Sequence, residues 1–471
     1  MVTPRTARPD FAAVRAEFDL PAAFPPDVLA EAAAVEPVTA GPDRVDATDV
    51  ELVTIDPPGS KDLDQAVGIA RTERGFVVHY AIADLGAVVE PGGALDAEVR
   101  RRGQTLYLPD GSVPLHPPVL SEGAASLLPD GDRPAVLWRI TLDEAGEARD
   151  VQVRRAMIRS RVQLDYAGVQ ADVDAGCPLP AALAALPELG PLRRALAVRR
   201  GAVELELPEQ EVVRSGDGWT VEVRRRSAVE DWNAEISLLT GMCAARMMLD
   251  AGVGLLRTLP VPDPADVAAL RRTALGLGVA WPEGAAPAEV LAGLRSTALG
   301  DGSALALALR RAATSLLRGA GYSWFGPGQA PPEDSGHGGI GAPYAHVTAP
   351  LRRLGDRFGS ELCLAIAAGE DPAPWLLDAL PTLPGLLSAS EARAGQVERA
   401  CMDRTEAGLL ADRVGEEVEV IVLRAEPGEV YLPEPPVMAR CDGTLKAGET
   451  VGVRLVEADP PTGRVRFSAG T

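Results

Sequence analysis

The hydrophobic pattern changes its period twice along the 471 residues, and these changes limit the folds open to the chain. Short apolar or β-branched runs bounded by Gly, Pro and Asp indicate strands at residues 50–55, 76–82 and 135–142. From residue 180 onward, Ala, Leu and Arg recur at i, i+3, i+4 spacing, which predicts helices. The predicted helices cover residues 180–200, 227–251, 263–276, 286–320, 356–368 and 385–412, with Gly- and Pro-rich loops at 322–343 and 369–384.

The second change falls near Arg413, after which the pattern is strand-like again. Apolar runs recur about every ten residues between Gly, Pro and Asp turns, as in a small OB-type β-barrel. We therefore expect an α+β multidomain protein with three parts. These are an N-terminal region at residues 1–46, a large mixed domain at 47–412 and a C-terminal OB-fold at 413–471.

Residues 1–46 are rich in Ala and Pro and contain two short helical patterns, at 10–18 and 25–35. Two short helices joined by a tight turn are compatible with a helix-turn-helix. The equally acceptable alternative is a lead-in segment that packs against the main domain.

Composition narrows the class of protein. No apolar run reaches the roughly 18 residues that a membrane-spanning helix needs, and the N-terminus has no apolar stretch typical of a signal peptide. The five cysteines are scattered without a Cys-x-x-Cys pair, which suits a reducing cytoplasm and argues against a zinc site. The net charge is −21, but binding depends on the local field, and arginines occur in tight groups. The charge neither supports nor excludes an RNA partner.

Three carboxylates, Asp56, Asp62 and Asp64, fall within nine positions in a segment that follows a predicted strand. In an extended segment Asp62 and Asp64 project to one face. Carboxylates packed so closely repel one another unless a cation lies between them, and oxygen ligands suit Mg²⁺ or Mn²⁺. A solvated acidic turn explains the same spacing equally well.

A second candidate segment, residues 344–356, places the pair Arg352–Arg353 just after a proline, where we expect a helix to begin. Guanidinium groups and helix N-termini both suit phosphate. A surface arginine pair without function is the plain alternative.

Together the two segments resemble the ribonuclease II (RNB) family. Its catalytic domain carries an early Ile-Asp-Pro-Pro…Asp-Leu-Asp-Asp-Ala motif and a late Thr-Ser-Pro-Ile-Arg-Arg-Tyr motif. Other similar stretches fall in the family's order: residues 78–84 (Val-His-Tyr-Ala-Ile-Ala-Asp), 105–109 (Thr-Leu-Tyr-Leu-Pro) and 229–239. The resemblance covers residues 48–410 and includes the C-terminal OB-fold. It implies a hydrolytic 3′-to-5′ exoribonuclease that converts single-stranded RNA to nucleoside 5′-monophosphates.

The resemblance implies roles for the acidic segment. Asp56, Asp62 and Asp64 match metal-site aspartates, with Asp64 the residue most important for chemistry, and two Mg²⁺ or Mn²⁺ ions are implied with substrate bound. The fourth motif position is Gln65, where the family has an aspartate. An amide oxygen can still ligate, but the site loses one negative charge. This departure leaves open a catalytically weakened RNA-binding relative.

Further residues are implied to contact RNA. Tyr107 matches a tyrosine beside the scissile phosphate, and Arg352 matches an arginine that braces the terminal phosphates. Tyr166 is similar to a base-stacking tyrosine, whereas Glu235 and Glu398 match glutamates near the 3′ end.

Larger relatives carry cold-shock-type domains before the catalytic motif, and only about 50 residues precede it here. We expect a short form, monomeric and cytoplasmic, with an open channel that accepts RNA with a 3′ overhang. A metal-dependent phosphoesterase for DNA or small nucleotides remains the third hypothesis.

Overall fold

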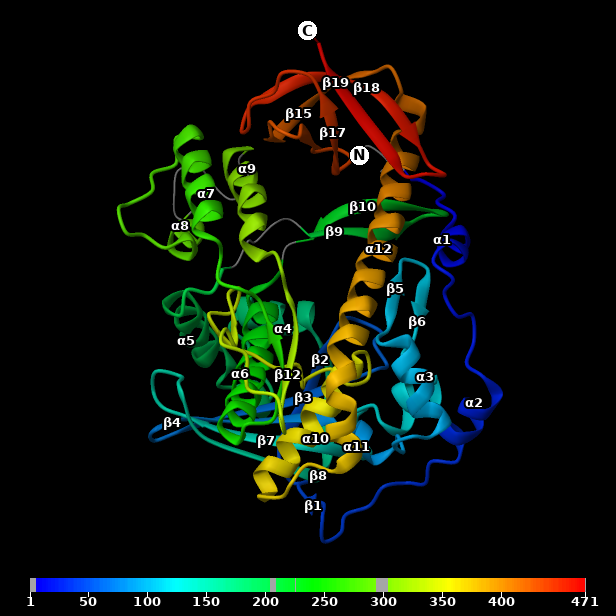
Figure 1. Ribbon diagram of the computed structural model, residues 1–471, viewed down its shortest axis with the longest axis vertical. Coiled ribbons are helices and arrows are strands. Elements are labelled where there is room, and N and C mark those ends of the chain that lie inside the picture. The colour runs from blue at the N-terminus through cyan, green and yellow to red at the C-terminus, as the bar shows by residue number, and fades with distance from the viewer. Residues whose placement is uncertain (1–5, 204–208, 225, 294–303, 471) are drawn as a thin grey trace.

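A six-stranded sheet forms the centre of the fold (Figure 1). The structure is a computed structural model and describes residues 6–203, 209–224, 226–293 and 304–470. The strand order is β1-β8-β2-β3-β4-β7, and β7 also pairs with β8, so the sheet returns on itself. Its strands are β1 (Val45–Asp46), β2 (Leu52–Asp56), β3 (Gln65–Thr72), β4 (Gly75–Ala83), β7 (Asp132–Leu142) and β8 (Ala148–Asp165).

The burial pattern of each strand explains whether it could be predicted from the sequence. Eight of the nine residues of β4 are buried, because both faces of this strand are covered. The predicted strands at 50–55, 76–82 and 135–142 correspond to β2, β4 and β7. The 18-residue strand β8 was missed, because it alternates arginines with the apolar residues that enter the core.

Helices cover the sheet and extend from it. They are α3 (Ala94–Arg102), α4 (Tyr166–Ala175), α5 (Leu186–Arg199), α6 (Ala228–Ala251), α10 (Leu354–Ala368), α11 (Pro374–Ala379) and α12 (Leu383–Leu410). Helix α6 begins with a capping box between Ser227 and Glu230 and packs against α5 and α10. The 28 residues of α12 span about 42 Å and connect the sheet region to the C-terminal barrel (Figure 1).

A smaller helical group has its own apolar core, formed with α7 (Pro264–Gly276), α8 (Pro287–Gly293) and α9 (Ala304–Ala313). The single helix expected over 286–320 is therefore wrong, and its portion at 294–303 lies outside the described residues. The loop expected at 322–343 was also wrong in part, because it contains strands.

The remaining two-stranded pairs are β5 (Leu106–Leu108) with β6 (Gly111–Val113), β9 (Glu209–Ser215) with β10 (Gly218–Arg224), β11 (Gly254–Thr258) with β12 (Gly321–Phe325), and β13 (Gly336–His337) with β14 (Ala342–Pro343).

The C-terminal residues form a closed five-stranded barrel with its own core, as the strand spacing predicted. Its strands are β15 (Glu417–Arg424), β16 (Glu429–Leu432), β17 (Val437–Asp442), β18 (Thr450–Asp459) and β19 (Arg464–Ala469). An ion pair of 2.5 Å between Arg311 and Glu429 joins the barrel to α9.

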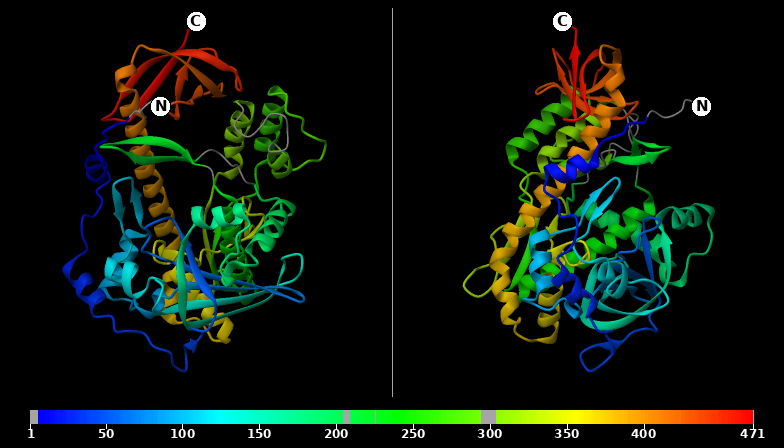
Figure 2. Two further views of the ribbon diagram at one scale, coloured as in Figure 1. Left: turned by 180° about the vertical axis from the view of Figure 1, so that it is seen from behind. Right: turned by 90° about the vertical axis from the view of Figure 1, so that its right-hand side faces the viewer.

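The N-terminal segment lies along the outside of the molecule (Figure 2). Helix α1 (Phe11–Glu17) packs against α12, whereas α2 (Pro26–Ala33) packs against α3. The two helices thus have different neighbours and do not form a helix-turn-helix. The lead-in alternative describes them. Within the described residues, no helix is long and apolar enough to cross a membrane.

Buried ion pairs connect the sheet to its surroundings. The carboxylate of Asp84, 1% exposed, accepts hydrogen bonds from Arg44 at 2.7 Å and from Arg155 at 2.6 and 2.7 Å. Arg155 also bonds Glu361 of α10 at 2.6 Å. This network ties β4 and β8 to α10 and to the segment that precedes β1.

Replacing Asp84 with asparagine should strongly destabilise the protein, because two guanidinium groups lose their shared charge in a buried site. We expect a loss of about 3–5 kcal/mol in unfolding free energy. The control is Asp250→Asn, which breaks the exposed pair with Arg246 and should cost less than about 1 kcal/mol. Equal losses in chemical denaturation would contradict a central role for the network.

A buried carboxyl also makes the contact between α12 and the barrel sensitive to pH. Burial and the nearby charge of Asp403 raise the pKa of Glu406 from 4.5 to about 8. Glu406 accepts a hydrogen bond from Gln210, which also bonds the Pro436 carbonyl. Because only the unfolded chain ionises between pH 4.5 and 8, stability should fall as pH rises through this window. Below pH 4.5, the contribution of Glu406 to stability is fully present.

Glu406→Gln removes this titration and should raise the melting temperature at pH 8 to 9, with little effect at pH 4.5. The control Glu419→Gln, at an exposed barrel position, should change neither. Thermal unfolding followed at pH 4.5, 7 and 9 measures the difference. A constant difference across this range would show that Glu406 does not titrate as described.

Candidate active site

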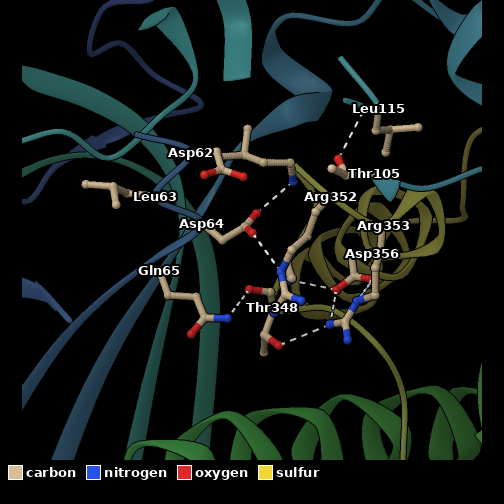
Figure 3. Close-up of polar contacts among 12 residues, drawn as sticks. Asp62, Leu63, Asp64, Gln65, Thr105, Leu115, Thr348, Arg352, Arg353 and Asp356 are labelled. Carbon is tan, nitrogen blue, oxygen red and sulfur yellow. Dashed lines mark hydrogen bonds and ion pairs between the residues drawn. The ribbon is translucent and has the colours of Figure 1, made fainter. Parts of the chain in front are cut away.

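Three segments that are distant in the sequence meet at one place. They are the loop after β2, the segment that enters β5, and the loop before α10 (Figure 3). The Thr105 amide donates to the Arg352 carbonyl and the Leu354 amide to the Gly103 carbonyl, both at 3.0 Å. Gly103 has φ +76°, a conformation that favours glycine. These bonds fix the arginine loop, residues 344–353, beside the strand that carries Tyr107.

The sheet and a neighbouring loop hold the acidic segment in place. Asp56 is the last residue of β2 and pairs in register with Asp165 at the end of β8. Farther along, the Leu63 amide donates to the Ser126 hydroxyl at 3.0 Å, and that hydroxyl donates to the Lys61 carbonyl at 2.6 Å. Leu63 is fully buried and anchors the residues on both sides of it. Asp62 and Asp64 are thereby presented by a rigid backbone.

The carboxylates lie in a partly dehydrated setting. Burial and the charge of Asp62 raise the pKa of Asp56 to about 6. Burial raises the pKa of Asp64 to about 7, although Arg352 and the Leu351 amide favour its charged form. Asp64 accepts from the Leu351 amide at 2.7 Å. Asp56 and Asp62 therefore repel each other and would gain most from a cation.

The two adjacent arginines have opposite surroundings (Figure 3). Arg352 is 45% exposed in its side chain, and its Nε lies 3.4 Å from Asp64 Oδ2. Arg353 instead turns inward and donates to both oxygens of the fully buried Asp356, at 3.0 and 2.7 Å. Of these two arginines, Arg352 is the one that presents an accessible guanidinium beside the acidic cluster.

Tyr107 stands at the edge of the same cluster. It is 55% exposed, and its hydroxyl donates to Asp62 Oδ2 at 3.4 Å. Partial desolvation of the hydroxyl beside the cluster and the charge of Asp62 raise the pKa of Tyr107. More than half of this aromatic side chain is exposed, so it adds little to the hydrophobic core. Its position makes it available to a ligand at the carboxylates.

Gln65 has partners at both ends of its amide. Its Nε2 donates to the Thr348 carbonyl at 2.7 Å, and its Oε1 accepts from the hydroxyl of Tyr80. The predicted contact of Gln65 with a metal remains a prediction. Thr348, Tyr80 and Ser126 have parts in this site that the sequence did not reveal, since only the fold brings these ordinary residue types to the acidic segment.

The remaining predicted residues differ in their placement. Tyr166 follows Asp165 at the start of α4. The Tyr166 hydroxyl accepts a hydrogen bond from Asn233 at 3.0 Å, and burial and the charge of Asp56 raise the pKa of Tyr166. Glu235 is only 1% exposed and faces Arg200, the C-cap residue of α5, at 3.9 Å. Glu398 is exposed on α12. The structure thus brings Asp56, Asp62, Asp64, Tyr107, Arg352 and Tyr166 together, whereas Glu235 and Glu398 lie in other surroundings.

Across the described ranges, no group of three or more His, Cys, Asp or Glu side chains is placed to share a metal ion. Mg²⁺ needs only one or two carboxylates when water and substrate phosphates complete its octahedron. The pair Asp56 and Asp62 fits such a site.

The described residues thus form a mixed α/β domain followed by a closed five-stranded barrel of the OB type. Residues 44–360 match the RNB domain, and residues 416–470 match the RNase II-type exonuclease C-terminal S1 domain. The chain belongs to the RNB family.

Relatives in sequence and structure agree with this assignment. Ribonuclease R 1 of Lactococcus lactis subsp. lactis is 25% identical over 505 residues, covering 97% of this chain and 60% of that protein. The chain thus spans less than two thirds of that relative. The structure of Mycoplasma genitalium RNase R in complex with ribose methylated single-stranded RNA matches with a TM-score of 0.87 at 20% identity, covering 98% of this chain and 77% of that one. Yeast Ssd1, a pseudonuclease, matches with a TM-score of 0.69 at 18% identity, over 86% and 52% of the two chains.

The opposite surroundings of the two arginines predict opposite effects of mutation. Arg353→Ala leaves the buried carboxylate of Asp356 without its partner and should cost about 3–5 kcal/mol in unfolding free energy. Arg352→Ala removes an exposed group and should cost less than about 1 kcal/mol. Chemical denaturation of both variants measures this difference. A loss for Arg352→Ala as large as that for Arg353→Ala would refute the assignment of inner and outer roles.

Proposed function

We propose that the protein is a hydrolytic 3′-to-5′ exoribonuclease that shortens single-stranded RNA and releases nucleoside 5′-monophosphates. The observation that carries this proposal is the convergence of the carboxylates with exposed Arg352 and Tyr107 at the meeting point of three segments. The names of the family's ribonuclease R members support the same activity. RNA is the proposed partner, because solved relatives are named as complexes with single-stranded and double-stranded RNA.

Asp56 and Asp62 would hold a divalent cation, Mg²⁺ or Mn²⁺. When bound, such an ion offsets the repulsion between these carboxylates, lowers the pKa of its water and neutralises charge on a phosphate. A second ion would arrive only with RNA. The raised pKa of Asp56 supports the proposal, because a buried carboxylate near a like charge is costly unless a cation compensates it.

The chain's own residues would bind and orient the terminal nucleotide. Arg352 offers N–H donors to the phosphate, and Asp64 keeps the guanidinium in place from behind. The Tyr107 ring flanks the phosphate from the opposite segment. Tyr166, next to Asp56, would stack on a base and contribute about 1–3 kcal/mol. Hydrolysis then breaks the bond between phosphorus and the 3′-oxygen of the preceding nucleotide.

A second candidate function is RNA binding with weakened catalysis. The favouring observation is Gln65, whose amide is engaged by Thr348 and Tyr80. Yeast Ssd1, which is named a pseudonuclease, has a similar fold. Such a protein would bind RNA without turning it over.

Asp64→Asn should lower the rate of RNA hydrolysis by at least about 100-fold while leaving RNA affinity within severalfold of the unaltered protein. The reason is that the variant keeps the acceptor for the Leu351 amide but loses the charge beside Arg352. The measurement uses 5′-labelled single-stranded RNA with Mg²⁺ or Mn²⁺ and follows product length and mononucleotide release. Asp250→Asn, an exposed aspartate on α6, serves as the control.

The outcomes separate the hypotheses. Progressive shortening with mononucleotide release, lost in Asp64→Asn, supports the exoribonuclease. Binding without turnover in either metal supports the weakened relative. Cleavage of single-stranded DNA at the same rate would instead indicate a less selective phosphoesterase.

A further inference from the structure

Two consecutive residues, Asp64 and Gln65, bond to the same loop (Figure 3). Asp64 Oδ1 accepts from the Leu351 amide at 2.7 Å, and Gln65 Nε2 donates to the Thr348 carbonyl at 2.7 Å. The two loop positions are three residues apart. A pair of hydrogen bonds with this spacing fixes both the position and the orientation of the loop that leads into Arg352.

The other end of the Gln65 amide is also occupied. Its Oε1 accepts a hydrogen bond from the hydroxyl of Tyr80, a fully buried residue on the adjacent strand β4. The oxygen is the amide atom that can bind a cation. In this structure that oxygen is directed to Tyr80 and the nitrogen to the arginine loop.

Thr348 is a junction for several elements. Its carbonyl accepts from Gln65. Its hydroxyl lies 2.8 Å from the Ser237 hydroxyl of α6 and 3.4 Å from Arg353 Nη2. One threonine thus connects β3, α6 and the start of α10. Loss of the Gln65 bond would remove one of the two side-chain hydrogen bonds that hold this loop to the segment at the start of β3.

We propose that Gln65 is a positioning residue that latches the arginine loop to the acidic segment, and that it does not bind the cation. This inference rests on the proposed function and sharpens it, since the resident ion is then held by Asp56 and Asp62. A carboxylate at position 65 cannot donate, and it would set a negative oxygen against the Thr348 carbonyl. Restoring an acid here would weaken the loop rather than complete a metal site.

Gln65→Glu tests the proposal, because the change is nearly isosteric and the two roles predict opposite results. The probe is Mn²⁺ alone, titrated calorimetrically into the full chain without RNA. For a latch, Mn²⁺ affinity should stay within about twofold, and the melting temperature without metal should fall by about 2–4 °C. Mn²⁺ binding at least tenfold tighter, with an unchanged melting temperature, would overturn the proposal.

Hydrogen exchange of the loop provides a second measurement that does not depend on metal or activity. In Gln65→Glu and Gln65→Met, amide exchange in a peptide spanning residues 348–354 should become about tenfold faster. Tyr80→Phe, which removes one hydroxyl from the same amide, should change it in the same direction by less. The matched control Tyr431→Phe, in the barrel, should leave it unchanged. Unchanged exchange in both Gln65 variants would also refute the latch.

One further variant distinguishes this inference from the proposed function. Asp56→Asn should lower Mn²⁺ affinity at least tenfold while leaving exchange in the 348–354 peptide unchanged. If Asp56→Asn leaves Mn²⁺ binding intact, the assignment of the resident ion fails, and with it the statement that Asp56 and Asp62 hold it. The exchange results for Gln65 would then still decide the latch.

Discussion

The site depends on the contact between the start of β3 and the loop before α10, which joins residues almost 290 positions apart. Asp64 and Gln65 reach Leu351 and Thr348, 287 and 283 residues later. Both bonds are 2.7 Å long; the first is buried and the second partly buried, and a hydrogen bond shielded from solvent is electrostatically stronger than one in water. Because the loop is fixed at these points, Arg352 is directed outward to the carboxylates and Arg353 inward to Asp356. The chemistry of the site follows from this backbone arrangement.

Motif order made part of the site predictable from sequence. Asp56 ends a predicted strand and Asp62 and Asp64 flank an apolar residue, while Tyr107 and Arg352 occur where the family places them. The structure brings these five residues together. Glu235 shows why the remainder was harder, since α6 carries polar residues around its whole circumference and periodicity does not show which of them face α5. Gln65 was interpreted as a weakened ligand because its partners, Tyr80 and Thr348, are identified only by the fold.

The fold was predictable where one pattern dominated. Strand β4 is nearly all apolar, and the barrel strands recur at regular spacing, so both were correctly anticipated. Strand β8 was not, because its arginines face outward or join buried carboxylates while Ala156 and Ile158 enter the core. Arg155 and Arg357 bond Asp84 and Asp96, as expected of a planar group that can bridge carboxylates in partly buried sites.

The distribution of charge also relates the two parts of the site. Asp64 has the Leu351 amide and Arg352 as partners within the chain, although burial still raises its pKa to about 7. Asp56 and Asp62 repel each other, because burial and the charge of Asp62 raise the pKa of Asp56 to about 6 and Arg352 offsets this only in part. On the proposed function, a cation at Asp56 and Asp62 removes this repulsion and presents positive charge to a phosphate already held by Arg352. Bound cation would then raise the affinity for RNA, and bound RNA the affinity for the cation. The reason is that the positive charge of the ion compensates the negative charge of the phosphate.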